Sequence, residues 1–340
     1  MIRIAVVILN WNGLHYLQKF LPSVCKYSDL PDTEIFVVDN GSTDDSVIFI
    51  RQAFPSVNLM VFEENFGFAP GYFKALQQIK ASYFVLLNSD VEVTPNWLIP
   101  LYKTIEADPM IGACMPKLRA YDHQQYFEYA GASGGFIDRF GYPFCRGRML
   151  NSVELDKGQY DDSCRIFWAS GACMFIRASA YDKAGGLDSE FFAHMEEIDL
   201  CWRLRRLGYA IMVVPQSTVY HVGGGTLPNN NPHKLYLNYR NNLFLLFKNL
   251  PVYQLIPMIL LRMILDGLSA LVYLCTGSGI FFIAVIRAHL AFTRRIPLLI
   301  NKRRELKGTV SSGKIMEIYP RSILVDFFIR KKRYFSQLEW

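Results

Sequence analysis

The sequence predicts an α/β fold in which helices flank a mostly parallel sheet, followed by an apolar helical region near the C-terminus. Short apolar runs alternate with helix-length segments through the first 116 residues. That alternation is typical of a parallel sheet with right-handed crossovers. Polar, glycine-containing stretches follow the apolar runs, and the most apolar segment covers residues 255–286.

The first 116 residues divide into short apolar runs and longer mixed segments. The runs show no polar alternation, so we expect strands that are buried on both faces. The expected strands are residues 2–9, 34–38, 57–62, 83–87 and 111–115, and the expected helices are residues 14–27, 44–54, 69–80 and 96–107.

The fourth expected strand ends in the small polar residues Asn88-Ser89-Asp90. Ligands of open α/β sheets bind beyond the carboxyl ends of the strands. A carboxylate there can hold a hard divalent cation on a diphosphate, which makes Asp90 a candidate metal ligand. The alternative is a plain strand end before a helix, because Pro95 can open the next helix.

Similar polar loops follow three other strands: Asn10-Trp11-Asn12-Gly13, residues 39–44 beginning with Asp39, and residues 65–71 with Asn65 and Gly67. Together they predict a crevice for a nucleotide, in which a carboxylate binds base or ribose and glycines admit phosphate. Each loop alone is also explained by turn chemistry. No glycine-rich dinucleotide motif or P-loop follows the first strand, which makes NAD and ATP chemistry unexpected.

Residues 117–165 are polar, aromatic and glycine-rich, and we expect a long excursion containing a hairpin or lid. After Trp168, the small residues 169–172 interrupt an apolar run. This pattern indicates close approach of a ligand or another backbone, and Gly171 lies in it.

A later helix, ending near Gly208, starts with three acids: Glu196, Glu197 and Asp199. They could simply complement the helix dipole, with Asp199 pairing with Arg203 one turn on. Partial burial could instead raise the pKa of Glu196 or Glu197 and make it a usable base.

His221 ends an expected strand over residues 213–222 and precedes three glycines. A lone histidine is more often structural than a ligand, but the glycines favour a ligand here. Arg240, on an expected helix over residues 234–250, could bind phosphate bidentately or could be an ordinary surface arginine.

The C-terminal region has the marks of a membrane-associating segment. Residues 267–286 carry no charge and could span a bilayer, whereas Gly277 and Gly279 favour an in-plane helix pair. From residue 287 onward there are 13 Lys and Arg against 4 Asp and Glu, a balance of +9 that leaves −3 for the rest. This predicts a basic cytoplasmic flank on an anionic membrane, and nucleic acid is disfavoured because no recognition motif accompanies the charge.

Two features bear on the location of the protein: the N-terminal segment and the cysteines. No signal peptide is expected, since the first apolar run has no charged n-region or cleavage site. The seven cysteines are never two residues apart, which fits a reducing cytoplasm better than disulfides or a zinc site.

Taken in order, six stretches over residues 2–248 resemble inverting family-2 glycosyltransferases of the Rossmann-like GT-A fold, in particular the bacterial rhamnosyltransferase-like branch. Their order and spacing carry the resemblance. They are residues 7–13, 38–44, 65–69, 87–91, 170–174 and 196–205.

The resemblance implies roles for the residues singled out above. Asp39 would contact base or ribose, Asp90 and His221 would hold Mg²⁺ or Mn²⁺, and Glu197 would be the catalytic base. Two departures stand out: Asn88 replaces the first acid of the usual Asp-x-Asp, and Glu197 replaces an aspartate. Glu196 or Asp199 therefore remains an alternative base. The remaining implied substrate contacts are Asn10, Asn12, Asn65, Gly67, Asn88, Trp168, Gly171 and Arg240.

The implied activity is metal-dependent, inverting transfer of a sugar, with rhamnose one candidate, from a nucleotide-diphospho-sugar to a glycan or lipid-linked acceptor. The implied setting is cell-surface polysaccharide synthesis at the cytoplasmic face of a membrane, by peripheral or monotopic attachment or a single span. The expected domains are 1–250, with a nucleotide-sugar half (1–116) and an acceptor half (117–250), and the membrane-associating region 251–340. The alternatives are an inactive sugar-binding or scaffold protein, and a nucleotidyltransferase, whose glycine-rich loop and lysine are missing.

Overall fold

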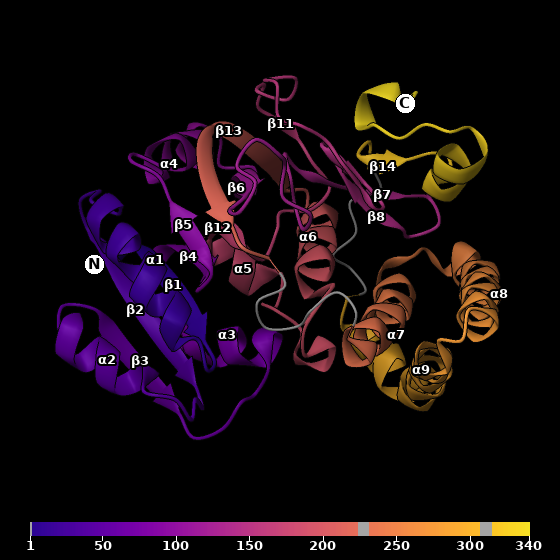
Figure 1. Cartoon of the computed structure of the whole chain (residues 1–340), viewed down its shortest axis with the longest axis horizontal. Coiled ribbons are helices and arrows are strands. Elements are labelled where there is room, and N and C mark those ends of the chain that lie inside the picture. The colour runs from indigo at the N-terminus through magenta and orange to yellow at the C-terminus, as the bar shows by residue number, and fades with distance from the viewer. Residues whose placement is uncertain (1, 224–230, 307–314) are drawn as a thin grey trace.

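A large mixed sheet forms the centre of the computed structural model, which describes residues 2–223, 231–306 and 315–340 (Figure 1). The strand order is β11-β13-β6-β12-β4-β1-β2-β3, and β5 pairs with β13. The central strands β1 and β4 are parallel and buried on both faces. Polar residues at their carboxyl ends therefore meet at one edge.

The first half follows the predicted alternation, with shifts of a few residues at the ends. The helix at Leu14–Tyr27 has the predicted bounds. The elements are β1 Ile2–Asn10, α1 Leu14–Tyr27, β2 Thr33–Asn40, α2 Ser46–Ala53, β3 Asn58–Phe62, α3 Phe68–Leu76, β4 Ala81–Asn88, β5 Val91–Val93, α4 Leu98–Ala107 and β6 Ile111–Ala120.

The second half makes the sheet mixed rather than mostly parallel. Strand β12 (Cys173–Arg177) runs antiparallel between β4 and β6, while β13 (Ala210–His221) runs parallel to β6. The short strand β11 (Cys164–Arg165) closes that side antiparallel to β13. Because β12 is antiparallel, its first residues lie beside the end of β4.

The excursion over residues 117–165 builds a second, small sheet. Its strands are β7 Gly135–Asp138, β8 Pro143–Cys145, β9 Arg148–Met149 and β10 Ser152–Val153. The expected hairpin is β7 with β8. The fifth strand, β14 (Ile318–Tyr319), comes from the C-terminal segment and pairs with β7 in parallel.

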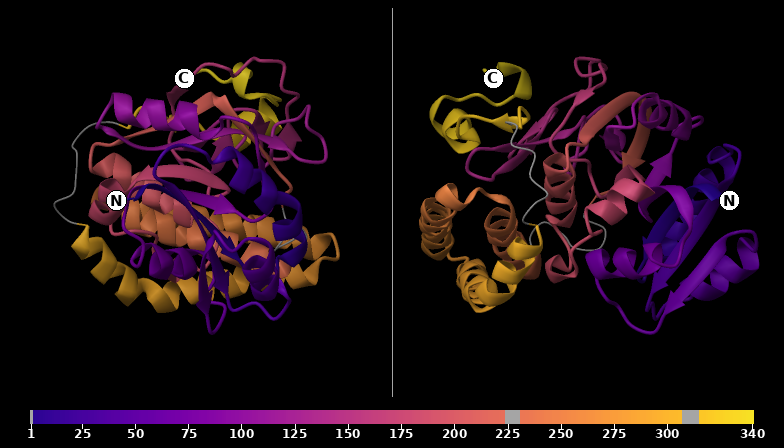
Figure 2. Two further views of the ribbon diagram at one scale, coloured as in Figure 1. Left: turned by 90° about the vertical axis from the view of Figure 1, so that its left-hand side faces the viewer. Right: turned by 180° about the vertical axis from the view of Figure 1, so that it is seen from behind.

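Helices connect and cover the two sheets in the second half of the chain. They are α5 Ala178–Lys183, the 3₁₀ turn η1 Ser189–Phe191, α6 Glu196–Arg206, α7 Pro232–Asn249, α8 Val252–Cys275 and α9 Gly279–Glu305. Both views of the molecule show α7, α8 and α9 as a separate group of helices beside α6 and below the C-terminal segment (Figures 1 and 2). In that segment, η2 Val325–Ile329 is one π-helical turn and η3 Phe335–Gln337 one 3₁₀ turn.

The structure corrects the expectation of one apolar span over residues 267–286. Helix α8 ends at Cys275 and α9 begins at Gly279, with Gly277 in the left-handed region at φ 77°. In the described part of the chain, Val252–Cys275 alone is long and apolar enough to cross a membrane, and 28% of its most apolar window is buried. The division of the chain at residue 250 stays a prediction.

Candidate active site

The loops after β1 and β2 are joined by side-chain hydrogen bonds. Asn10, fully buried, donates from Nδ2 to Asp39 Oδ2 over 3.2 Å. The other oxygen of Asp39 accepts from the backbone N–H of Ser42 at 3.0 Å. Asn12 Oδ1 accepts from the backbone of Thr43 at 2.7 Å. Asp39 is thus fixed at the sheet edge, as a contact to a base or ribose requires.

The loops after β2 and β3 are joined in the same way by Asn40. Its Nδ2 donates to Asn65 Oδ1 at 3.0 Å and to the carbonyl of Gly67 at 3.1 Å. Gly67 has φ 91°, and a Cβ there would lie 2.4 Å from the ring of Phe192. Only glycine lets this loop approach the segment that precedes the acids of α6.

At the end of β4, Asp90 faces His221 at the end of β13. Asp90 Oδ1 lies 3.1 Å from His221 Nε2, and Asn88 Nδ2 lies 3.4 Å from the same nitrogen. On the other side of the ring, Glu128 Oε1 lies 3.3 Å from His221 Nδ1. All three charged groups are at least nine-tenths buried. Gly223 is described, whereas residues 224 and 225 of the glycine run lie outside the described residues.

Burial lowers the pKa of His221, but the carboxylates of Asp90 and Glu128 raise it to about 10. Burial raises the pKa of Asp90, while His221 lowers it by more, so the net shift is downward. Without a cation, the imidazolium of His221 offsets one of the two carboxylate charges and leaves the cluster with one net negative charge. A bound dication would replace that proton.

The donor set fits a divalent cation that also binds substrate. A carboxylate oxygen and an imidazole nitrogen suit Mn²⁺, and ions of this class usually take their remaining ligands from phosphates and water. Glu128 lies on the far nitrogen of His221 and cannot reach the same ion. Accordingly, no cluster of three or more His, Cys, Asp or Glu side chains in the described ranges converges on one point.

Strand pairing brings Glu197 to the same edge as Asp90. The backbone N–H of Asn88 donates to the carbonyl of Ala172 at 3.0 Å, next to Gly171. A Cβ at Gly171 would lie 3.8 Å from the Cβ of Glu197. Residues 171–172 therefore separate the metal-ligand candidates at the end of β4 from the acids of α6. Gly171 places no side chain between the end of β4 and Glu197.

Burial gives the first two acids of α6 high pKa values. The pKa of Glu197 is raised to about 7 by burial, against backbone N–H groups that lower it. Burial and the neighbouring Glu197 raise the pKa of Glu196 well above its usual range. One oxygen of each, Oε2, has no hydrogen-bond partner among the described residues. Glu197 is therefore matched to proton transfer near neutral pH.

The segment before Glu196 is strained and tightly held. Phe192, His194 and Met195 all have φ between 63° and 72°, which is unfavourable for residues with a Cβ. Asn241 Nδ2, on α7, lies 2.7–2.9 Å from the carbonyls of Phe191, Ala193 and His194. Helix α7 thus fixes the loop that positions Glu196 and Glu197.

Asp199 belongs to a buried ion-pair network instead. It is fully buried and accepts from Arg203 Nε at 2.8 Å, Lys248 Nζ at 2.7 Å and Asn249 Nδ2 at 2.8 Å. Burial raises its pKa, but Arg203 and Lys248 lower it by more. With its oxygens occupied by cations and an amide, Asp199 is a poor general base.

Two other predicted substrate contacts have structural partners. Trp168 is buried and donates from Nε1 to the carbonyl of Phe136 at 2.9 Å. Arg240 donates from Nη2 to the carbonyls of Glu190 and Phe191 at 3.2 and 3.0 Å. The predicted contacts of Trp168 and Arg240 with substrate stay predictions. Because Trp168 is buried, the structure gives no support to its predicted contact.

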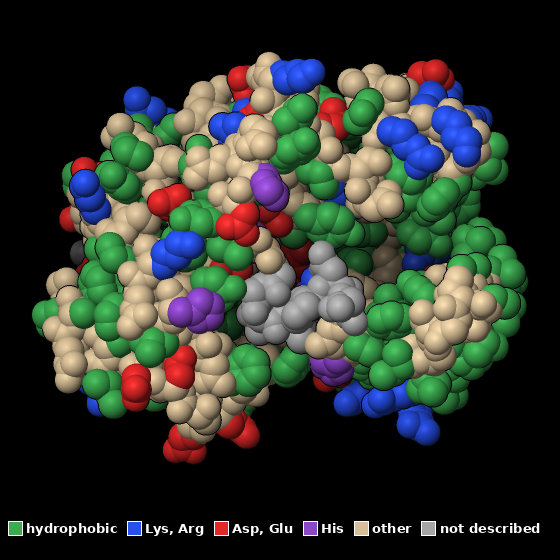
Figure 3. All heavy atoms as spheres, viewed as in Figure 1, with side chains coloured by type: hydrophobic (Ala, Val, Ile, Leu, Met, Phe, Trp, Pro, Cys, Tyr) green, Lys and Arg blue, Asp and Glu red, His purple; other side chains and the backbone are tan. Residues whose placement is uncertain are grey.

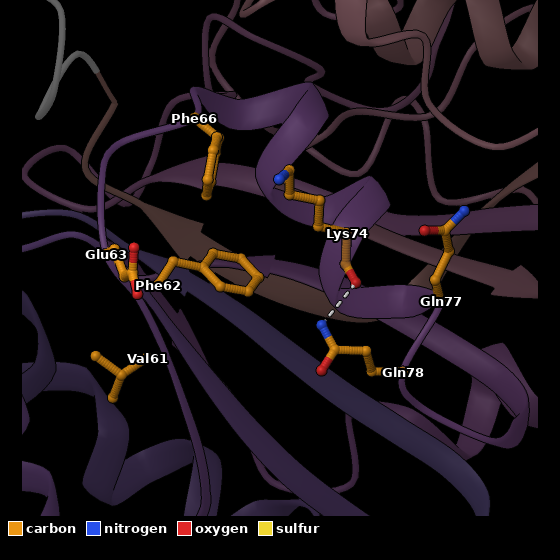
Figure 4. Close-up of a pocket in the computed structure, with 7 residues that line it drawn as sticks. All are labelled: Val61, Phe62, Glu63, Phe66, Lys74, Gln77 and Gln78. Atoms are coloured by element: carbon orange, nitrogen blue, oxygen red, sulfur yellow. Dashed lines mark hydrogen bonds between the residues drawn. The ribbon is translucent and has the colours of Figure 1, made fainter.

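A shallow cavity of about 340 Å³ lies away from these residues, between the edge strand β3 and helix α3 (Figure 4). Phe62 and Phe66 line it together with Lys74, whose Nζ lies 3.7 Å from the centroid of the Phe66 ring. None of the predicted site residues contributes to it, so we assign it no part in the reaction.

Sequence reasoning missed Glu128, Asn40 and Asn241. Asn40 lies inside a recognised motif, but the predicted contact to base or ribose was assigned to its neighbour Asp39. Glu128 and Asn241 carry no motif of their own, because their partners lie far away in the chain. In the sequence, the one signal for Glu128 was its place as an acid within the polar excursion over residues 117–165.

Polar loops at the carboxyl ends of a Rossmann-like sheet, with Asp90 and His221 on one side of residues 171–172 and the high-pKa carboxyl of Glu197 on the other, are typical of the GT-A class of glycosyltransferases. Residues 5–184, more than half of the chain, match the family model described as "Glycosyl transferase family 2". The chain therefore belongs to that family and is a glycosyltransferase, as the resemblance predicted.

Curated relatives include two rhamnosyltransferases. N-acetylglucosaminyl-diphospho-decaprenol L-rhamnosyltransferase of Mycobacterium tuberculosis is 26% identical over 231 residues, which are 64% of this chain and 75% of the relative. Rhamnosyltransferase WbbL of Escherichia coli is 23% identical over 224 residues, 64% of this chain and 82% of the relative.

Solved glycosyltransferases share the fold. GalNAc-T7, solved with UDP, GalNAc and Mn²⁺, aligns with a TM-score of 0.57 and 19% identity over 73% of this chain. This chain spans only 48% of that protein. TarS of S. aureus, residues 1–349, aligns with a TM-score of 0.52 and 18% identity over 90% of this chain and 88% of TarS. At these identities the likeness shows the fold alone.

Proposed function

We propose that this glycosyltransferase transfers a sugar, with rhamnose the first candidate, from a nucleotide-diphospho-sugar to a hydroxyl of a lipid-linked saccharide, with inversion and with a divalent cation. The observation that carries the proposal is the pairing of Asp90 with His221 at one end of residues 171–172 and Glu197 at the other. The two rhamnosyltransferase relatives support the sugar, and the name of the first supports the lipid diphosphate.

On the donor side, Asp39 binds base or ribose, and the loop containing Gly67 lets backbone approach the phosphates. Asp90 and His221 would hold the divalent cation, which would supply charge neutralisation at the nucleoside diphosphate. Glu128 lies 3.3 Å from His221 Nδ1, in the place from which carboxylates orient metal-binding histidines. Asn88 stands where the usual Asp-x-Asp motif has its first aspartate, so the motif carries one negative charge instead of two.

On the acceptor side, Glu197 removes the proton of the attacking hydroxyl. A carboxyl with a pKa near 7 is half ionised at neutral pH and accepts a proton more readily than an ordinary glutamate. The hydroxyl attacks the anomeric carbon from the side opposite the diphosphate, so a single displacement inverts the configuration. Glu196 is more deeply buried and stays protonated beside it.

We propose further that the enzyme lies on a membrane through α8 and α9. Hydrophobic side chains gather over these helices at the right-hand edge of the molecule (Figure 3). Exposed members on α8 include Ile256, Leu260, Ile264 and Leu268. A contiguous apolar surface of this kind is unusual on a protein that faces only water.

The inner face of α8 favours attachment in the plane of the membrane over a span. Arg262 and Asp266 are buried there, 3.3 Å apart, and Arg262 lies 3.7 Å from the ring centroid of Tyr142, in the turn between β7 and β8 of the second sheet. A helix that crossed the bilayer would carry this part of the sheet into hydrocarbon. Strand edges do not tolerate that.

The test is a transfer assay on the full chain with a panel of nucleotide-sugars, including a nucleoside-diphospho-rhamnose, and a polyprenyl-diphospho-saccharide acceptor. We expect transfer that EDTA abolishes and Mn²⁺ restores, and a product whose anomeric configuration, read by NMR, is inverted. Asp90→Asn and Glu197→Gln should each lower the rate by about 10²–10⁴-fold. Full activity in both variants, or a retained configuration, would disprove the mechanism.

A further inference from the structure

Four side chains form a cationic cluster where α7 meets α9. Arg240 and Arg287 lie over the same ring, Tyr236, with their guanidinium carbons 5.4 and 5.7 Å from its centroid. His233 stacks on the same Tyr236 ring, with the ring centroids 5.9 Å apart and an interplanar angle of 23°. The two arginines lower the pKa of His233, which burial also lowers.

The cluster has little internal compensation for its charge. In the described part of the chain, no carboxylate pairs with Arg240 or Arg287, and Glu190, the nearest acid on η1, pairs with Arg295 at 3.8 Å. Arg240 donates from Nη2 to backbone carbonyls and from Nε to the amide oxygen of Asn241, and none of these neutral acceptors neutralises it. Two guanidinium groups beside one aromatic ring, without a carboxylate partner, favour an anionic ligand with several oxygens.

The surroundings of Arg287 select the kind of anion. On α9 it is exposed, and so are the apolar neighbours Ile283, Ile286 and Leu290 on the same stretch of helix. An isolated guanidinium on an apolar surface is typical of a contact with a lipid headgroup, since the arginine stem packs with acyl chains and the charge reaches phosphate.

The cluster also adjoins the reaction site. Arg240 donates to the carbonyl of Phe191, and His233 packs against Phe192 with ring centroids 6.5 Å apart. Phe192 in turn contacts Gly67 of the donor loops and lies four residues before Glu196. A ligand on Arg240 and Arg287 would therefore sit between the apolar surface and the catalytic acids.

We propose that Arg287 and Arg240, with His233, form the binding site for the diphosphate of a lipid-linked acceptor. The lipid chain lies along the apolar surface of α8 and α9, and the first sugar after the diphosphate points toward Glu197. The inference rests on the proposed function and adds the place and the residues of acceptor binding. It reassigns Arg240 from the donor diphosphate to the acceptor diphosphate.

The test measures binding of the full-length protein to vesicles, without donor or metal. Phosphatidylcholine vesicles carry either polyprenyl diphosphate or phosphatidylglycerol at matched surface charge, and sedimentation gives the affinity for each. We expect the wild type to bind polyprenyl diphosphate vesicles more tightly than phosphatidylglycerol vesicles. Arg287→Ala should reduce this ratio of affinities about tenfold. Arg287→Lys, which keeps the charge without the planar fork, should recover part of it.

Arg294→Ala is the matched control, because Arg294 is an exposed arginine on the same helix and has no partner among the described residues. It should weaken binding to both vesicle types equally and leave the preference intact. Equal losses of preference in Arg287→Ala and Arg294→Ala would overturn the site. So would an Arg287→Ala variant that loses affinity for a nucleoside diphosphate with Mn²⁺, since the site would then serve the donor.

The outcome separates this inference from the proposed activity. A preference that depends on Arg287 in a protein that transfers no sugar would keep the site and reject the activity. Transfer to a lipid-linked acceptor with no effect of Arg287→Ala on the acceptor KM would keep the activity and reject the site.

Discussion

At the scale of single residues, Glu197 combines burial with an unpartnered oxygen, and both properties have measurable consequences. Its carboxyl must be ionised to act as a base. Because burial raises its pKa to about 7, kcat/KM should rise as pH increases from 6 to 8, with a midpoint near 7. The measurement is a pH profile of transfer with saturating cation, and a profile flat over this range would contradict the assignment.

The same carboxyl also predicts a pH-dependent change in stability. Its folded pKa of about 7 exceeds the ordinary value of 4.5, so its stabilising contribution is complete below about pH 4.5 and is lost as pH rises through 7. Glu197→Gln has no charge to bury. Relative to wild type, we expect it to gain about 1–3 kcal/mol in unfolding free energy between pH 5 and pH 8. Urea unfolding at both values measures this, and an equal difference at pH 5 and 8 would refute it.

Glu128 allows a prediction that does not depend on turnover. Behind a metal-binding histidine, removal of a carboxylate typically costs 10–100-fold in metal affinity. Glu128→Gln should therefore weaken Mn²⁺ binding in the presence of a nucleoside diphosphate by about tenfold, as read from the EPR signal of free Mn²⁺. Glu154→Gln is the control, since Glu154 is a buried acid of the same segment that bonds Tyr160 and not His221. Equal effects of both substitutions would reduce Glu128 to a structural role.

At the scale of elements, the sequence predicts best where the signal is local. Strands β1 and β4 and helix α1 follow from uninterrupted apolar runs and helical spacing, and their ends fall close to the predicted residues. The second sheet could not be predicted, because β9 and β10 are two residues long and gain their partners from distant segments. The break in the long apolar segment did have a local signal, Gly277, whose φ of 77° ends α8.

The candidate site shows the same contrast between residues with a local sequence signal and residues whose partners come from distant segments. Asp90 and Glu197 stand at the ends of recognisable elements, so motif and position identified them together. His221 could be proposed, but its partner Glu128 could not, since their contact exists only after the excursion over residues 117–165 folds onto β13. Asp199 looked like a third candidate base in sequence, and its neutralisation by Lys248 depends on the packing of α7 against α6.

The network around Lys248 ties three elements together and makes the next prediction. Lys248 on α7 is buried and lies 2.6 Å from Asp188 and 2.7 Å from Asp199, while Lys302 on α9 pairs with Asp188 at 2.7 Å. Lys248→Met leaves the buried carboxylates of Asp188 and Asp199 with one cationic partner fewer each and should cost about 3–5 kcal/mol in unfolding free energy. Lys302→Ala removes a partly exposed partner and should cost about 1 kcal/mol or less. Equilibrium unfolding in urea at pH 7 compares the two.

Acid pH gives the check on that mechanism. Burial raises the pKa of Asp188 and Asp199, but their lysine and arginine partners lower it by more in the folded protein. Their contribution is present above about pH 4 and is lost as pH falls below it. The difference between wild type and Lys248→Met should therefore shrink as pH falls toward the pKa values of the uncompensated carboxyls. A difference that stays constant down to pH 4 would point to lost packing instead.

At the scale of the whole molecule, the C-terminal segment changes the interpretation of the basic tail. Arg330 pairs with Asp326, Lys332 with Glu339, and β14 joins the second sheet. Several cations counted toward a membrane-binding tail are thus neutralised within the protein. If the enzyme lies on a membrane as proposed, the surface left for it is the apolar face of α8 and α9, with Arg287 within it, and apolar contact would contribute more to binding than the net charge suggests.

That surface predicts the orientation of the enzyme on a bilayer. Leu260 and Leu271 are both exposed on α8 and are eleven residues apart, about 16 Å along a helix. If α8 lies in the membrane plane, spin labels at the two positions have the same depth, about 5–10 Å below the headgroups. If α8 spans the bilayer, their depths differ by most of the 16 Å. Power-saturation EPR of Leu260→Cys and Leu271→Cys in vesicles, with the exposed Cys275 changed to Ser, distinguishes the two arrangements. Because Arg262 packs α8 against the turn between β7 and β8 of the second sheet, we expect equal depths, and a third label, on Ile256→Cys, should report the same value.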